Sequence, residues 1–239
     1  MKKTALRIAA LLLAAGSLQA DTIVQTHEIV THGPGNSDNK SVDTWSFDEF
    51  NTLGGALTLN SVQIIFSTQA WDGYIGTDND GANGASGTVS FNLYNALTSG
   101  KTLVNSSGSE AWANQYIRRA TTFNLAADDL DGAGYQEGGT DWDSFSGPTE
   151  GNADTASANI FIHDALKSFY QGTGTFNMSA TSYQQLNAII GGYSEVQASS
   201  QLAKGSVTII YDYIPEPATA SMSILVLIAG FWIRRRFID

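Results

Sequence analysis

The chain of 239 residues contains no cysteine and only three histidines. Without cysteine there are no disulfides, no thiolate metal ligands and no cysteine nucleophile, so a folded domain depends on its hydrophobic core alone. His27 and His32 lie five residues apart, which places them on opposite faces of a strand, and His163 is distant in sequence. We therefore predict no histidine metal site.

Basic residues are also scarce. Residues 21–213 contain six Lys and Arg against 21 Asp and Glu, a net charge of −15 within a whole-chain charge of −11. Such a charge makes nucleic acid and anionic lipid poor partners, while it favours solubility and divalent cations. Proline is rare as well, with only four in the chain.

Catalytic motifs are missing. No Gly-x-Ser-x-Gly sequence marks a nucleophile elbow. Asp141, Asp143 and Glu150 beside Trp142 could in principle serve a glycosidase, which needs two suitably separated carboxylates. Because acidic residues are so abundant, solvated acidic loops explain this group better than a catalytic pair does. We predict that the protein is not an enzyme, with a polysaccharide-acting hydrolase as the least supported alternative.

Residues 1–20 have the pattern of a secretory signal peptide. Three basic residues within the first seven precede an apolar run, Ile8–Ala15, and a polar segment starts at Asp21. The run is too short for a permanent membrane span, which needs about 20 residues. We expect export by the Sec machinery and cleavage between Ala20 and Asp21.

The segment 214–239 contains a second membrane signal. Pro215-Glu216-Pro217 predicts an extended, exposed joint, because two prolines continue neither a strand nor a helix. Ala218–Ile233 is an apolar run of 16 residues, about 24 Å long as a helix. Arg234-Arg235-Arg236 then fixes a single transmembrane helix with its C-terminus in the cytoplasm. Residues 21–213 should lie on the opposite side of the membrane.

This ending resembles the PEP-CTERM sorting signal of Gram-negative bacteria that produce extracellular polysaccharide. The resemblance covers about 25 residues: the Pro215-Glu216-Pro217 motif, the apolar run and the arginine cluster. It implies an exosortase, a membrane cysteine protease-transpeptidase, as partner. The chain would then be anchored transiently in the inner membrane, cut near the motif, and released to the outer cell surface or extracellular matrix. An uncut C-terminal tail anchor is the competing interpretation.

The segment between the two signals predicts an all-β fold, an antiparallel β-sandwich of the jelly-roll kind. Apolar and polar residues alternate in several stretches, as in strands with one buried face: 22–30, 56–67, 88–98, 173–180 and 206–213. The alternation slips at Asn60-Ser61, which predicts a bulge or a turn. Loops are expected at 32–39, 76–87, 131–139 and 147–153, and a helix only at Ser182–Ile190, whereas 160–170 fits either a strand or a short helix.

This body also resembles choice-of-anchor surface domains, type E among them. The resemblance rests on 50–58, 170–175 and the last strand, 207–213. It implies how the domain is anchored and gives no activity.

Two kinds of ligand site remain open. Asp78-Asn79-Asp80-Gly81 and Asp128-Asp129-Leu130-Asp131-Gly132 are similar to the start of a calcium-binding loop, although neither completes the pattern. Calcium candidates are therefore Asp78, Asp80, Asp129 and Asp131. Tryptophans near Gly-rich stretches could bind sugar or plug the core: Trp45, Trp71, Trp112 and Trp142.

We therefore expect a non-enzymatic structural or display protein at the cell surface or in the matrix. A carbohydrate-binding module or adhesin that contacts exopolysaccharide is the alternative.

Overall fold

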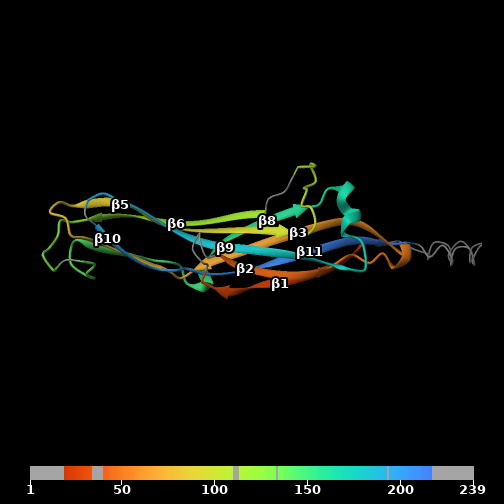
Figure 1. The fold of residues 1–239 in the computed structure, drawn as a ribbon, viewed down its shortest axis with the longest axis horizontal. Coiled ribbons are helices and arrows are strands. Elements are labelled where there is room, and N and C mark those ends of the chain that lie inside the picture. The colour runs from red at the N-terminus through yellow and green to blue at the C-terminus, as the bar shows by residue number, and fades with distance from the viewer. Residues whose placement is uncertain (1–18, 34–39, 110–112, 133, 193, 217–239) are drawn as a thin grey trace, which may run out of the picture.

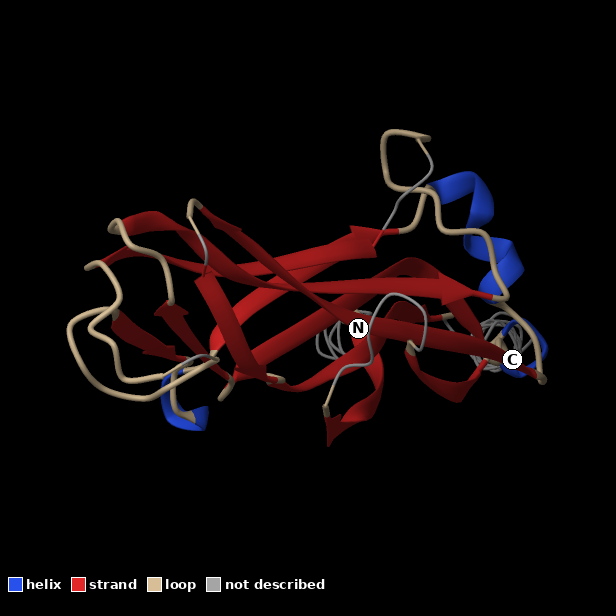
Figure 2. Cartoon of the chain, turned by 60° about the vertical axis from the view of Figure 1, so that its left-hand side comes forward, coloured by secondary structure: helices blue, strands red, loops and turns tan. Residues whose placement is uncertain are grey.

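The computed structural model describes residues 19–33, 40–109, 113–132, 134–192 and 194–216. Strands account for most of this part of the chain, with three short 3₁₀ helices between them (Figure 2). The strands are β1 (Asp21–His32), β2 (Ser41–Asp48), β3 (Leu57–Trp71), β4 (Tyr74–Asn79), β5 (Ala85–Ser99), β6 (Ala113–Leu125), β7 (Trp142–Ser146), β8 (Asp154–Phe161), β9 (Thr175–Ile190), β10 (Ser194–Ser199) and β11 (Leu202–Pro215). The helices are η1 (Leu53–Gly55), η2 (Glu150–Asn152) and η3 (Asp164–Tyr170).

Two four-stranded sheets form the body. Their strand orders are β1-β11-β3-β8 and β2-β9-β5-β6, and all pairs within them are antiparallel. The core between them contains fully buried side chains from both sheets, among them Phe66 and Ile209 from one and Phe47 and Met178 from the other. The predicted all-β sandwich is confirmed.

A third sheet extends one layer of the sandwich. Its strand order, β10-β4-β7, matches the order β11-β3-β8 in the first sheet. Each of its strands is the neighbour in sequence of the matching strand: β10 comes directly before β11, β4 directly after β3, and β7 directly before β8. The layer breaks between β3 and β4, where Asp72 and Gly73 take φ values of 61° and 87°. Ile75 of β4 then packs in a second core with Phe91 and Phe123. The result is the long, narrow molecule in Figure 1.

The two ends of this molecule differ. At one end, which we call the terminal end, Asp21 of β1 pairs with Tyr213 of β11. At the other, which we call the acidic end, lie the turns that join β4 to β5, β6 to β7 and β9 to β10 (Figure 1). The start of β1 and the end of β11 thus lie at the end opposite these turns.

Most of the predicted strands are confirmed, and so is the bulge. Burial alternates along β3 as the sequence alternation requires. Asp212 pairs with Ser61 but Tyr213 pairs with Leu59, so Asn60 is the extra residue on β3. The ambiguous segment 160–170 is divided between the end of β8 and η3.

Ser182–Ile190 is not a helix, contrary to the prediction. It is the second half of β9 and pairs with β5, Tyr183 opposite Tyr94 and Ile190 opposite Gly87. Its apolar residues at helical spacing do not face one core: Leu186 is 38% exposed. Long-range pairing with β5 therefore prevails over the local pattern. The expected loop at 76–87 was also too long, since β4 reaches Asn79 and β5 starts at Ala85.

Pro215 also differs from expectation, because it is the last residue of β11 and pairs with Leu57. A proline fits there for a simple reason. On the other side of β11, β1 begins at Asp21 opposite Tyr213, so no neighbour requires an N–H from residue 215. The strand-like path continues to Glu216, whose N–H donates to Ala56 O at 2.8 Å.

Several predicted features lie outside the described residues. They are the signal peptide up to residue 18, Trp112, Pro217, the apolar run Ala218–Ile233 and the arginine cluster. No helix in the described part of the chain is long and apolar enough to cross a membrane.

Candidate metal site at the acidic end

Four aspartates converge at the acidic end. Three come from the loop after β6, and the fourth, Asp141, directly precedes β7. One carboxylate oxygen from each lies within 4.8 Å of the others: Asp128, Asp129, Asp131 and Asp141. We call this group the aspartate cluster.

Hydrogen bonds within the loop hold the cluster together. The Asp129 N–H donates to Asp141 Oδ2 at 2.9 Å, and the Leu130 N–H donates to Asp128 Oδ1 at 2.8 Å. Leu130 has a φ of 70°, in the left-handed region that non-glycine residues seldom adopt. Gly139 lies against the cluster, and a Cβ there would come within 2.2 Å of Asp129 Oδ2. The loop thus requires glycine at position 139.

Acidic side chains from β4, β10 and the turn after β4 hold the remainder of the loop. Asp78 of β4 accepts the Gln136 N–H at 2.6 Å, Asp80 accepts the Gly134 N–H at 3.0 Å, and Glu195 of β10 accepts the Tyr135 N–H at 2.9 Å. The loop therefore has carboxylates beside it in addition to those of the aspartate cluster.

Tyr135 provides an aromatic anchor for the same loop. Its hydroxyl is 2.8 Å from the Tyr74 hydroxyl and accepts the Trp142 Nε1–H at 3.0 Å. Burial, followed by the hydrogen bond with Tyr135, raises the pKa of Tyr74 to about 12. Tyr74 therefore stays neutral and adds no further negative charge at physiological pH.

Two carboxylates at this end are buried and incompletely paired. Asp141 and Asp78 are each 1% exposed. In each, Oδ2 accepts a backbone N–H, whereas Oδ1 has no hydrogen-bond partner among the described residues. A buried carboxylate oxygen without a partner is costly, and proteins normally satisfy it with a donor or a cation.

Among the described residues, no Lys, Arg or His forms an ion pair with the cluster. Residues 120–166 contain neither Lys nor Arg. The ion pairs found between described residues involve Glu49, Asp154, Asp164 and Glu150 instead. Burial and the nearby charges of Asp129, Asp141, Asp78 and Asp128 raise the pKa of Asp131, in that order of importance. The carboxylates thus repel one another without local compensation.

Sequence patterns found part of this site. Of the four calcium candidates, Asp129 and Asp131 belong to the cluster. Asp78 lies close enough to affect the pKa of Asp131, and Asp80 only holds the loop backbone. Asp141 was not predicted as a metal ligand, because the folded loop brings it to Asp129 from twelve residues away.

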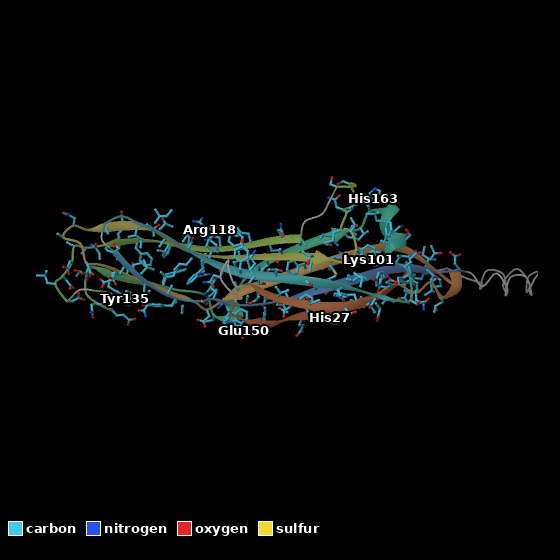
Figure 3. All side chains as sticks on the ribbon, in the orientation of Figure 1. His27, Lys101, Arg118, Tyr135, Glu150 and His163 are labelled. Atoms are coloured by element: carbon cyan, nitrogen blue, oxygen red, sulfur yellow. The ribbon has the colours of Figure 1, made fainter. Side chains whose placement is uncertain are left out.

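The acidic residues considered for sugar hydrolysis do not gather in one place. Asp141 is buried in the cluster, whereas Asp143 is exposed on β7. Glu150 pairs with Lys204, and Figure 3 places it near the middle of the molecule, far from Tyr135 in the acidic loop. This arrangement does not favour a catalytic carboxylate pair.

Trp71 and Trp45 pack in or against the core, and His27 and His163 lie at hydrogen-bonding distance from backbone atoms. Trp71 is a core residue at 6% exposure, and Trp45 packs half-buried against the core. His27 Nε2 is 3.1 Å from Ser46 O, and His163 Nδ1 accepts the Ala165 N–H at the start of η3. Figure 3 shows these two histidines on different parts of the molecule.

No protein family and no curated protein matches the chain. Among solved structures, a chain of the T13 IBDV viral particle is 12% identical with a TM-score of 0.24, over 82% of this chain and 35% of that one. This chain thus spans little more than a third of that protein. Desmodium yellow mottle tymovirus gives 8% identity and a TM-score of 0.24, over 82% of this chain and 83% of the viral one. These likenesses are too weak to carry an argument.

Proposed function

We propose that the chain is an exported protein, displayed at the surface or in the extracellular matrix of a polysaccharide-producing Gram-negative bacterium. Its role is structural rather than enzymatic, and its domain is a jelly-roll sandwich. The Sec machinery exports it, and an exosortase processes it at the Pro215-Glu216-Pro217 motif. In support of the jelly-roll form, the chain crosses repeatedly between the sheets β1-β11-β3-β8 and β2-β9-β5-β6.

The pairing of Asp21 with Tyr213 is the observation that carries this proposal. Asp21 is both the first residue of β1 and the residue after the expected signal cleavage. Glu216 of the sorting motif lies beside Ala56 at the same end. A membrane-bound tail would therefore hold the sandwich by its terminal end and leave the acidic end facing outward (Figure 1).

Replacing Pro215-Glu216-Pro217 with three alanines tests the sorting step. We expect a full-length, membrane-bound chain, measured by mass and by cell fractionation, where the unaltered chain is cut and released. Pro148→Ala is the matched control, since Pro148 lies far from the motif in sequence. Its backbone carbonyl accepts a hydrogen bond from the Asp72 N–H, and alanine keeps that carbonyl. Unchanged processing of the triple variant would refute the proposal.

Carbohydrate binding is the second candidate, favoured by a row of tyrosines on the outer face of β6, β5 and β9. Tyr94 lies between Tyr116 and Tyr183, with ring centroids 5.0 and 4.8 Å apart. The Lys40 ammonium covers the Tyr183 ring at 5.0 Å, while Tyr116 is 49% exposed. Aromatic rings of this kind can pack against sugar rings.

Co-sedimentation with the host exopolysaccharide tests this candidate. Tyr116→Ala should reduce binding, whereas Phe161→Ala, which removes an equally exposed ring (48%) from the other sheet, should not. If the unaltered protein binds no polymer, the adhesin hypothesis fails.

A further inference from the structure

We propose that the aspartate cluster binds one Ca²⁺ ion, with Asp128, Asp129, Asp131 and Asp141 each supplying a carboxylate oxygen. This site is independent of the sorting proposal, because all of its residues lie at the acidic end.

The donor set determines the class of ion. All four ligands are carboxylates, without His or Cys, which suits a hard cation rather than zinc or copper. Ca²⁺ takes oxygens at about 2.3–2.6 Å, so oxygens on opposite sides of one ion lie about 4.6–5.2 Å apart. The observed spread, within 4.8 Å, accommodates one such ion. Mg²⁺, with ligands at about 2.0–2.1 Å, would need a tighter octahedron.

The buried oxygen of Asp141 points independently to a ligand. Asp141 is 1% exposed, belongs to the cluster, and its Oδ1 has no partner among the described residues. The other oxygen, Oδ2, is already occupied by the Asp129 N–H. A bound cation would satisfy Oδ1 without disturbing this hydrogen bond, so the loop is already folded in a form that can receive the ion.

A cation would also remove the electrostatic cost of the cluster. Four aspartates crowd together without Lys or Arg anywhere in residues 120–166. Like charges at such distances destabilise the folded form, and a divalent ion reverses the sign of the interaction.

The ion would fasten the loop to the sandwich. Asp141 connects the cluster to the sheet, because its carbonyl accepts the Asn79 N–H at 3.1 Å, at the end of β4. Asp128, Asp129 and Asp131 come from the loop after β6, where the Asp128 N–H donates to Gly81 O at 3.0 Å in the turn after β4. A shared ion would therefore clamp the β6–β7 loop onto the β10-β4-β7 sheet.

Calorimetric titration of the full chain tests the site. The purified protein in detergent is stripped with chelator and titrated with CaCl₂, and its thermal unfolding is followed with CaCl₂, MgCl₂ or chelator. We expect one ion per chain, a Kd of about 10⁻⁴–10⁻³ M as in extracellular calcium modules, and a higher Tm in calcium.

Variants distinguish a built site from diffuse attraction. Asp131 is exposed and accepts no hydrogen bond from another described residue. Asp131→Asn should therefore leave the apo fold intact and weaken calcium binding about tenfold or more. Asp141→Asn should weaken it as well. Asp143→Asn removes the same charge from β7 outside the cluster and should change the Kd less than about twofold.

Three results would overturn the proposal. One is the absence of calcium binding and of a Tm shift at millimolar calcium. Another is an equal loss of affinity in Asp131→Asn and Asp143→Asn, which would indicate unspecific attraction to a negative surface. The third is a Tm shift with MgCl₂ as large as with CaCl₂, which would contradict the assignment to calcium.

Discussion

Glu49 joins three segments through a single carboxylate at the terminal end of the sandwich. Its Oε1 lies 2.6 Å from Lys101 Nζ, and its Oε2 accepts the Gly174 N–H at 3.3 Å. The hydrogen bond from Lys101 is the main reason that the pKa of Glu49 lies below its usual value. The ionised form is therefore stabilised by folding.

This shift predicts the direction of a pH dependence. Because the pKa is lower in the folded state, the stabilisation is present above the pKa of an unfolded Glu and disappears as pH falls through the folded value. Glu49→Gln should therefore cost about 1 kcal/mol at pH 7 and much less near pH 3, measured by urea unfolding.

Glu150→Gln is the matched control for Glu49→Gln. Glu150 also pairs with a lysine, Lys204, but its side chain is 59% exposed, so we expect less than about 0.5 kcal/mol. Equal losses for both variants at pH 7, or a Glu49→Gln cost that does not change with pH, would contradict this account.

The aspartate cluster shows how far single residues can be predicted from sequence. Asp129 and Asp131 are visible because acidic residues and a following glycine cluster locally. Asp141 is not, because its membership depends on the hydrogen bond from the Asp129 N–H that closes the loop. Acidic residues that lie within one short segment form a recognisable sequence pattern. A residue that reaches the group only when the loop folds back does not.

At the scale of elements, alternation identified strands where one face is buried. Burial alternates from Val62 to Ala70 in β3 and from Val207 to Tyr211 in β11, and the slip in β3 was predicted at Asn60-Ser61. The second half of β9 was wrongly predicted as a helix. Leu186 and Ile189 are apolar but exposed, so the spacing of apolar residues does not indicate which face of this segment is buried. The strand conformation of this segment depends on its pairing with β5, which joins residues about a hundred positions apart in the sequence.

The break between β3 and β4 depends on Gly73. Its φ is 87°, and a Cβ would lie 2.8 Å from Gln201 Cγ and 3.1 Å from Phe91 Cζ. Gly73→Ala therefore adds a clash to a backbone penalty, and we expect a loss of about 2–3 kcal/mol in urea unfolding.

Gly54→Ala, in η1, is the control that separates the clash from the backbone penalty. Gly54 has a φ of 69° with open space around its Cβ position, so only the backbone penalty, about 1 kcal/mol, should remain. If both variants lose the same stability, close packing does not determine the shape of the break.

At the scale of the whole molecule, the start of the proposed sorting motif, Pro215-Glu216, is docked on the sandwich. Pro215 pairs with Leu57, the Glu216 N–H donates to Ala56 O, and the Thr58 hydroxyl donates to the Glu216 carboxylate. A protease that takes this motif as an extended peptide must first detach it. Under the proposed function, the rate of cutting therefore depends on a local opening equilibrium.

Thr58→Val should consequently accelerate processing. The substitution keeps the β-branched shape and removes the hydrogen bond to Glu216, which is worth about 1 kcal/mol, so the detached form should become roughly fivefold more populated. Pulse-chase labelling followed by gel separation measures the cutting rate. Thr26→Val is the control, since it removes a contact with Thr208 in the same sheet without contacting the motif. A rate that stays the same in both variants would mean that detachment does not limit the cut, whereas a slower rate in Thr58→Val would mean that the protease recognises the docked form.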